Sequence, residues 1–436
     1  MSPSIPRAGS ARDRLRAVLL RTPGAVPTIA AAQLLATSLW FSANSEAARV
    51  LAAWHAPAQA LGWMSSAVQL GFIVGTLGLS LGGLADRYRA SSVFVASACA
   101  GALVNAWLAL SPGSLASGLL NRWLLGLCLA GIYPLGMKLI VTWAAQGVGS
   151  ALAQLVAMLT LGTALPQLLH VLGNGISWHL VVLAASLLAL VGACMIGVLG
   201  DGPNAMAPRV ASRRGDSALR QRFTVGLRAF GIPGFRSAAM GYFGHMWELY
   251  AFWVAVPTLV GKCALGRMLS PAGIWMTCFC VMAMGAVGCL AGGFMSRRFG
   301  SPRVAAAALA LSGLCCAAFA LTWRDVGPWW LLGLLLLWGA AVVADSPQFS
   351  AVAAATCPPD LLGSALALQN SIGFALTVVA IPAFGSSLLR YGLDATWLLL
   401  PGPILGLVAF LPVLQCPDLA NPARRGEGPL LESTGS

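Results

Sequence analysis

The stretch LLLLWGAAVVADSPQFSAVAA, Leu334 to Ala354, is apolar enough to lie in a lipid bilayer, yet it carries an acid near its middle. Asp345 interrupts a run of Leu, Val and Ala, and Pro347 follows two residues later. An ionisable side chain inside a membrane span is costly, so it is expected to face a partner or a polar pathway. Proline removes a backbone hydrogen bond and bends a helix. The stretch therefore predicts a bent membrane helix with a functional carboxyl group at the bend.

The whole chain has the composition of an integral membrane protein. Of its 436 residues, 58% are hydrophobic and 9% are charged, whereas an average soluble domain has about 25% charged residues. Apolar segments of roughly 20 residues, which cross about 30 Å of hydrocarbon as a helix, recur along the chain. Twelve spans are predicted, at residues 26–50, 59–82, 90–110, 115–141, 148–172, 179–199, 235–260, 270–295, 302–322, 328–356, 362–389 and 395–414.

Basic residues are distributed unevenly between the two sides of these spans. The formal net charge is +13. With the N-terminus in the cytoplasm, nineteen Lys and Arg residues fall on the cytoplasmic side and five on the outer side. This asymmetry follows the positive-inside rule, so the charge reports topology rather than nucleic-acid binding. Arg outnumbers Lys by 24 to 2, a GC-rich bacterial bias. We expect a multi-pass protein of the bacterial cytoplasmic (inner) membrane with both termini in the cytoplasm.

A polar segment divides the spans into two sets of six, and short basic turns repeat at matching places. GGLADRYRA (82–90) follows the second span and GFMSRRFG (293–300) follows the eighth. Placing Gly82 on Gly293 aligns Arg87 with Arg298, an offset of 211 residues. This pattern indicates an internal repeat of membrane helices. The predicted organisation is a cytoplasmic tail (1–25), an N-terminal six-helix bundle (26–200), a basic cytoplasmic linker (201–233), a C-terminal six-helix bundle (234–415) and a cytoplasmic tail (416–436).

Prolines repeat in the same way. Pro134 lies in GIYPLG of the fourth span and Pro347 lies in ADSPQF of the tenth. The 211-residue offset brings Pro134 to within two residues of Pro347. Both spans are therefore predicted to break or bend at these places.

The first basic turn resembles a loop motif of the major facilitator superfamily. The family pattern Gly-x-Leu-Ala-Asp-Arg-x-Gly-Arg-Arg is matched at Gly82, Leu84, Ala85, Asp86 and Arg87 and departs at Arg89 and Ala90. NRWLLG (121–126) is similar to the family's Arg-x-x-x-Gly pattern in the fourth span. The resemblance implies an all-α membrane protein with 12 transmembrane helices in two pseudo-symmetric six-helix bundles. It also implies a secondary transporter whose bundles rock around a central site.

The resemblance implies roles for the basic turns as well. Gly82, Asp86, Arg87 and Arg298 are expected to form the inner gate. A carboxylate such as that of Asp86 is favoured near a helix N-terminus. The alternative is a solvated loop that only follows the positive-inside rule.

Few ionisable residues fall inside the predicted spans, and most lie on the first, fourth, seventh and tenth, which the resemblance places around the cavity. They are Arg122, Lys138, His170, His245, Glu248 and Asp345, with Glu46 and Arg49 at the outer end of the first span. Glu248 and Asp345 lie about 2 Å and about 4 Å from the middles of their spans, at about 1.5 Å per residue. His245 and Glu248 are three residues apart and share a helix face. We predict Glu248, Asp345 and His245 as proton-coupling residues, and favour Glu248 because it lies deeper, beside His245. The alternative for this pair is interhelical hydrogen bonding, and we interpret His170 as a packed polar contact.

Cationic side chains lie in the first half and carboxylates in the second, which favours an anionic substrate and an acidic proton carrier. Arg122 and Lys138 would supply counter-charges, although Lys138 is close enough to a span end to reach the interface instead. The predicted substrate-binding residues are Arg122, Lys138, Tyr133, Trp247, Gln348 and Asn44. GIYPLGMK (131–138) shows a partial likeness to the family's bacterial nitrate, nitrite and cyanate branch. The paired arginines of that branch are absent from spans 59–82 and 270–295.

The sequence therefore predicts a proton-coupled secondary transporter of a small solute, with an organic or inorganic anion favoured. One alternative is a proton-driven exporter of amphipathic drugs or metabolites, although LGTALPQLLH (161–170) lacks the exporters' Gly-Pro-x-x-Gly-Gly signature. A remote alternative is a non-transporting membrane sensor or assembly protein. We expect no enzyme activity, no metal site and no cofactor beyond the proton gradient. The expected partners are a small-molecule substrate and the lipid bilayer, without nucleic acid, for a monomeric protein.

Overall fold

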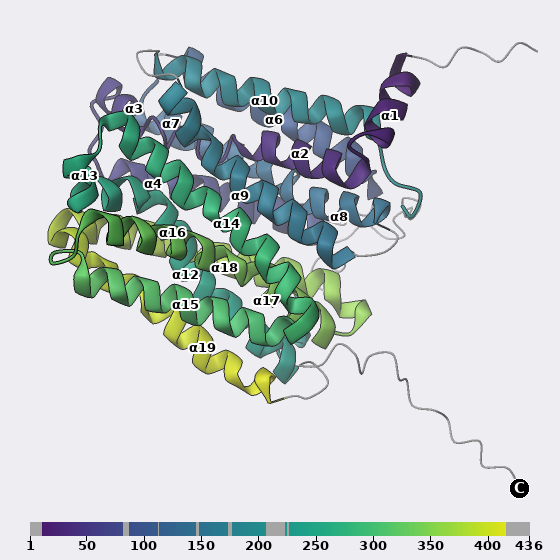
Figure 1. Cartoon of the computed structure of the whole chain (residues 1–436). Coiled ribbons are helices and arrows are strands. Elements are labelled where there is room, and N and C mark those ends of the chain that lie inside the picture. The colour runs from purple at the N-terminus through teal and green to yellow at the C-terminus, as the bar shows by residue number, and fades with distance from the viewer. Residues whose placement is uncertain are drawn as a thin grey trace, which may run out of the picture. The chain divides into compact units, whose positions relative to one another are not determined.

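The computed structural model describes residues 11–81, 87–111, 113–144, 148–172, 177–205, 223–224 and 226–415, and these residues form helices and turns without any strand (Figure 1). The first six predicted spans correspond to α2 (Ala25–Thr37), α4 (Ala60–Leu81), α6 (Ala90–Leu110), α7 (Leu115–Ala130) with α8 (Tyr133–Trp143), α9 (Val148–Leu172) and α10 (Trp178–Leu199). The last six correspond to α12 (Pro233–Lys262), α14 (Pro271–Phe299), α15 (Ser301–Thr322), α16 (Pro328–Ala344) with α17 (Ser346–Thr356), α18 (Pro359–Tyr391) and α19 (Pro401–Leu414). The predicted all-α membrane fold is confirmed.

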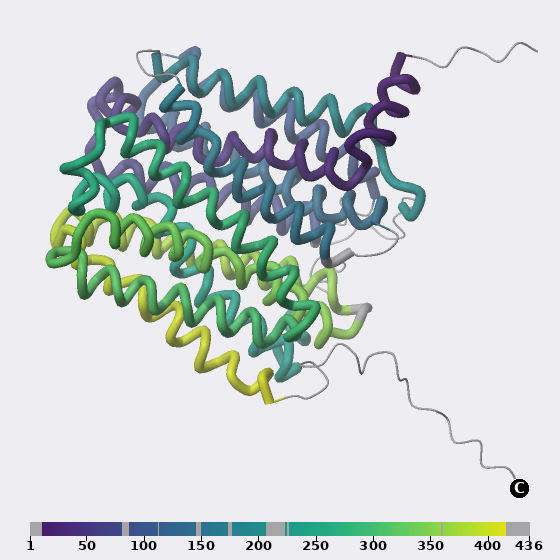
Figure 2. Tube along the Cα trace, viewed as in Figure 1, coloured from purple at the N-terminus to yellow at the C-terminus, as the bar shows by residue number. Residues whose placement is uncertain are grey.

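Four shorter elements complete the chain: α1 (Ala11–Arg21), α3 (Ala47–Ala53), α13 (Ala264–Met268) and the 3-10 helix η1 (Gly392–Leu399). Among the described residues, nine segments are long and apolar enough to cross a membrane, and one of them, Leu361–Leu414, holds two successive helices. A tenth is added if α1 and α2 count as one span with a bend of 102°. The tube in Figure 2 turns sharply at this bend. The chain is a multi-pass membrane protein.

The chain divides into two compact units. The N-terminal unit comprises Met1–Leu219 with Leu269–Ala283, and the C-terminal unit comprises Arg220–Met268 with Met284–Ser436. The division runs through α14, whose first part packs with the N-terminal helices. The bundle limits expected from the sequence stay predictions.

Glycines allow close helix packing inside the N-terminal unit. α4 packs along α7, and a Cβ atom on Gly71 would collide with the backbone oxygen of Trp123. On the facing helix, a Cβ atom on Gly126 would collide with the backbone oxygen of Val68. Small residues let membrane helices approach until their backbones touch, which is the main source of packing energy in lipid.

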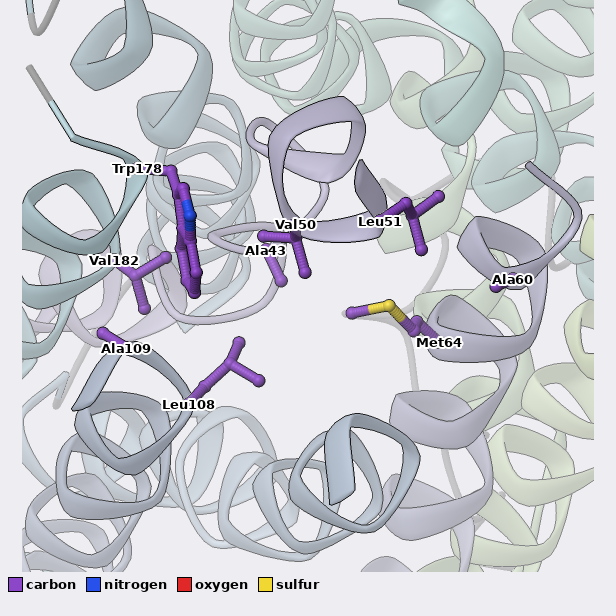
Figure 3. Close-up of a cluster of buried hydrophobic side chains, with 9 residues drawn as sticks. All are labelled: Ala43, Val50, Leu51, Ala60, Met64, Leu108, Ala109, Trp178 and Val182. Atoms are coloured by element: carbon purple, nitrogen blue, oxygen red, sulfur yellow. The ribbon is translucent and has the colours of Figure 1, made fainter. Parts of the chain in front are cut away.

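An apolar cluster surrounds the segment where the first predicted span is broken. Residues 38–46 leave the helical path after α2 as a series of turns, and α3 follows them. Figure 3 shows side chains from these turns and from α3, α4, α6 and α10 around one centre. The buried members are Ala43, Val50, Leu51, Ala60, Met64, Leu108, Ala109, Trp178 and Val182. The cluster buries Ala43 of the turns together with Val50 and Leu51 of α3, which favours this packing against α4, α6 and α10.

Two spans are broken at matching positions, as the prolines predict. α7 ends at Ala130 and α8 starts at Tyr133, whereas α16 and α17 meet at Asp345. Pro134 and Pro347 each lie in the first turn of the second piece. Proline is tolerated there because the first N–H groups of a helix have no intrahelical partner. The predicted breaks are confirmed.

The basic turns also match in geometry. Arg87 lies over the ring of Tyr88 at 5.7 Å from the ring centre, and Arg298 lies over the ring of Phe299 at 5.4 Å. The 211-residue offset aligns these two pairs, although the same kind of contact also occurs between Arg324 and Trp323 and between Arg390 and Tyr391. Gly82 and Asp86 lie outside the described residues.

Candidate functional site

A buried imidazole–carboxylate pair joins two helices of the C-terminal unit. His245 lies on α12, and Asp345 lies at the break between α16 and α17. The Nδ1 atom of His245 is 2.7 Å from Oδ1 of Asp345, and both side chains are buried. The two groups are at ion-pair distance but are not aligned for a regular hydrogen bond. His245 Nε2 and Asp345 Oδ2 have no hydrogen-bond partner among the described residues.

Further polar groups lie near this pair, on α12 itself and on α18, which packs against α12. Tyr242 lies one turn before His245, with ring centres 5.8 Å apart. On α18, Gly373 lies so close to the Tyr242 ring that a Cβ atom would collide with it. Gln369 is one turn before Gly373 on the same face. Its amide is fully buried without a partner in the described part of the chain. The interior of this unit thus holds hydrogen-bonding groups that its own described residues do not satisfy.

Glu248 is buried differently from Asp345. Its Oε1 atom accepts a hydrogen bond from Trp338 Nε1 at 2.7 Å, and its Oε2 atom accepts one from Ser312 Oγ at 2.9 Å. Both donors are neutral, and the Trp338 ring packs on Phe252 with centres 4.3 Å apart. A serine hydroxyl can donate or accept, so this arrangement suits either protonation state of the carboxyl group. Glu248 therefore ties α12 to α15 and α16.

The pairing differs from the one favoured by the sequence. The three-residue spacing placed His245 beside Glu248, but the imidazole contacts Asp345 instead. The reason is that α17 packs against α12 and brings Asp345 to the ring. Spacing along one helix reports a shared face, whereas the contact depends on the neighbouring helix.

Arg122 is fully buried in the N-terminal unit and is already bonded. Its guanidinium donates to the backbone oxygens of Leu39 and Trp40 at 3.3 and 2.7 Å and to Asn105 Oδ1 at 3.3 Å. The two backbone oxygens belong to the turns that follow α2. Leu39 O also accepts from Ser42, so Arg122 adds to a network that ties these turns to α6 and α7. These contacts favour a structural task for Arg122.

Asn105 is the centre of this network, and the sequence reasoning missed it. Its Oδ1 atom also accepts from Ser42 Oγ at 2.8 Å. Its Nδ2 atom donates to the Val182 backbone oxygen and to Ser186 Oγ, each at 3.0 Å. The only sequence signal is a lone amide in the apolar span 90–110, which does not reveal its partners.

A second acid–imidazole pair lies in the N-terminal unit. His170 Nδ1 on α9 is 2.5 Å from Oε1 of buried Glu46, and Arg49 NH1 is 3.5 Å from Oε2 of the same carboxylate. The His170 ring also packs on Trp275, with centres 4.4 Å apart. His170 is thus a polar contact, as expected, and its partner is a carboxylate 124 residues away.

The remaining residues that were predicted to bind substrate lie on different elements of the chain. Asn44 Nδ2 donates to Ser65 Oγ at 2.8 Å, and Trp247 Nε1 donates to the Leu398 backbone oxygen at 2.9 Å. Gln348 is buried, Tyr133 is half-buried and Lys138 is exposed on α8. Their assignment to a substrate stays a prediction. Within the described ranges, His, Cys, Asp and Glu form no group of three that could hold a metal ion.

Two solved structures share this fold. The nucleoside transporter NupG matches with a TM-score of 0.65 at 16% sequence identity, over 89% of this chain and 98% of that chain. The human organic anion transporter MFSD10 (TETRAN) matches with a TM-score of 0.63 at 18% identity, over 93% of this chain and 100% of that chain. No protein-family model and no curated protein sequence matches. At these identities the likeness shows the fold alone, which is the all-α major facilitator fold.

Proposed function

We propose that the protein is a secondary active transporter of the major facilitator superfamily that moves a small solute by alternating access, coupled to protons. The fold is that of two transporters. The observation that carries the coupling is the buried contact between His245 and Asp345 at a helix break, 2.7 Å from Nδ1 to Oδ1. In a membrane interior such a pair marks a proton or substrate pathway more often than a scaffold.

The pair suits proton exchange for three reasons. An imidazole and a carboxyl group both take up and release protons. An imidazolium with a carboxylate is neutral as a pair, whereas either loss or gain of a proton leaves a net charge. Asp345 also lies where α16 and α17 meet, so a change in its contact with α12 acts where this span is interrupted. Proton binding would then bias one conformation over another.

Glu248 is proposed as a positioning residue of the same unit. Both of its oxygens are held by fixed neutral donors, Trp338 and Ser312. Asp345 Oδ2 and His245 Nε2 have no such partner among the described residues. This contrast shifts the proposed carrier from Glu248, which the sequence favoured, to the His245–Asp345 pair.

The substrate is proposed to be a small organic or inorganic anion, as the charge distribution suggests, and the human neighbour is an organic anion transporter. One observation favours a second class. Both terminal nitrogens of the buried Arg122 guanidinium donate to protein oxygens, and only its Nε lacks a partner among the described residues. A neutral solute that binds through hydrogen bonds, such as the nucleoside class of NupG, is therefore the second candidate.

We propose, as before, that the basic turns form the inner gate. Arg87 and Arg298 are both exposed at these turns. We propose that the protein acts as a monomer in the bacterial inner membrane, with no cofactor beyond the proton gradient.

Proteoliposomes that contain a trapped pH dye test the proposal. Uridine, benzoate and tetraphenylphosphonium represent a nucleoside, an organic anion and a lipophilic cation. We expect one of the first two to move protons on addition and to accumulate when a proton gradient is imposed. Proton-driven movement of the lipophilic cation alone would support the exporter alternative and contradict the proposed substrate classes. Binding of a solute without any proton movement would contradict coupling.

A further inference from the structure

The N-terminal segment before the first span forms a helix at a steep angle to that span. α1 covers Ala11–Arg21, and its axis is bent by 102° from that of α2. Because α2 begins a membrane span, a helix at nearly a right angle to it runs close to the plane of the bilayer surface. The sharp turn is visible at the purple end of the tube in Figure 2.

The sequence of α1 divides into an apolar face and a basic face. Positions 11, 15, 18 and 19 share one face at helical spacing and carry Ala, Leu, Val and Leu. Leu15 is 56% exposed and Val18 is 60% exposed. The other positions include four arginines and one acid, namely Arg12, Arg14, Arg16, Arg21 and Asp13. The helix is therefore amphipathic and basic.

Two of the arginines fix α1 on the N-terminal unit. Arg12 NH2 donates to the Gly197 backbone oxygen at 2.9 Å, near the end of α10. Arg16 lies over the Trp143 ring at 5.8 Å, at the end of α8. These contacts hold the helix beside the ends of two spans, yet they leave Leu15 and Val18 uncovered.

We propose that α1 is an interfacial helix that lies in the headgroup layer and binds anionic phospholipids. Its apolar face would enter the boundary of the acyl chains, and its arginines would contact phosphate groups. Three observations support binding of anionic phospholipid to α1: the angle to the first span, the basic charge and the exposed apolar side chains. Juxtamembrane basic residues are attracted to anionic leaflets, and this attraction is absent from a neutral bilayer.

Photocrosslinking of the full-length protein in nanodiscs tests this proposal. A benzoylphenylalanine replaces Val18 in one sample and Ala17 in a matched control. Ala17 is also exposed but lies on the opposite side of the helix from Leu15 and Leu19, about 160° away at 3.6 residues per turn. The nanodiscs contain phosphatidylcholine with or without phosphatidylglycerol. We expect Val18 to crosslink to lipid several-fold more than Ala17, with a higher yield when phosphatidylglycerol is present.

Three results would overturn the proposal. The first is equal lipid crosslinking from positions 17 and 18. The second is crosslinking of position 18 to protein, whether a second copy or another chain, in place of lipid. The third is a lipid yield at position 18 that does not depend on phosphatidylglycerol. The double variant Arg14→Gln/Arg21→Gln adds a charge test, because it should lose the phosphatidylglycerol dependence; retention of that dependence would contradict the role of the arginines. None of these outcomes depends on transport activity.

Discussion

His245 on α12 and Asp345 at the break between α16 and α17 are in contact, with 2.7 Å between Nδ1 and Oδ1 and with both side chains buried. The contact links α12 to the break between α16 and α17. Because its strength depends on the protons that the two groups carry, proton binding can change how the two helices hold each other. We therefore assign proton coupling to this contact.

Glu248→Gln should keep proton-driven transport. The amide oxygen can accept from Trp338 Nε1, and the amide NH2 can donate to Ser312 Oγ, so both contacts survive. We expect the melting temperature in detergent and the solute accumulation to stay close to those of the wild type. Glu248→Leu is the matched comparison, since it leaves two buried donors without partners at a cost of about 1–3 kcal/mol each. Loss of accumulation with intact exchange in Glu248→Gln would make Glu248 the carrier.

Arg122→Ala should destabilise the protein more than it affects solute binding. The substitution removes three buried hydrogen bonds, to the backbone oxygens of Leu39 and Trp40 and to Asn105 Oδ1. A hydrogen bond to a charged group contributes about 1.5–3 kcal/mol, so thermal unfolding should begin at a clearly lower temperature. Arg122→Lys should recover part of the loss, because Lys keeps the charge but lacks the planar fork. An unchanged melting temperature with strongly weakened anion binding would return Arg122 to the substrate site.

Gly126→Ala should weaken the packing of α4 on α7. The added Cβ atom would meet backbone atoms of Val68 and Phe72, which cannot move aside as a flexible side chain can. Overpacking of this kind costs about 1–3 kcal/mol. Gly78→Ala is the control on the same helix pair, since no atom lies within 4 Å of its added Cβ. Equal melting temperatures for the two variants would show that α4 and α7 are not packed this closely.

The sequence was sufficient for the two proline breaks and for the spans after the first, which was predicted at 26–50 but leaves the helical path after Thr37. Apolar length sets the spans because lipid demands internally bonded helices, and Pro134 and Pro347 mark the breaks because proline fits the start of a helix piece. The basic tail, in contrast, was not expected to hold a helix. Its amphipathic pattern covers only Ala11–Arg21, too short to stand out as a span.

The partners of the buried polar groups could not be predicted. His245 and Asp345, and likewise Glu46 and His170, lie on helices far apart in sequence. A sequence reports the depth of a residue and its helix face, whereas the pairing depends on which helices pack together. Arg122 donates to the Leu39 and Trp40 backbone oxygens in the turns that follow the end of α2 at Thr37. The sequence around Arg122 does not predict where α2 ends.

The most direct measurement compares Asp345→Asn with Glu248→Gln in proteoliposomes, using the solute that moves protons in the wild type. Asparagine keeps the size of the side chain but cannot take up or release the proton. Two assays are run on each variant: accumulation driven by an imposed proton gradient, and exchange of labelled for unlabelled solute without a gradient. We expect Asp345→Asn to lose accumulation and to keep exchange, and Glu248→Gln to keep both. Accumulation up a proton gradient by Asp345→Asn at the wild-type level would contradict proton coupling at the His245–Asp345 pair.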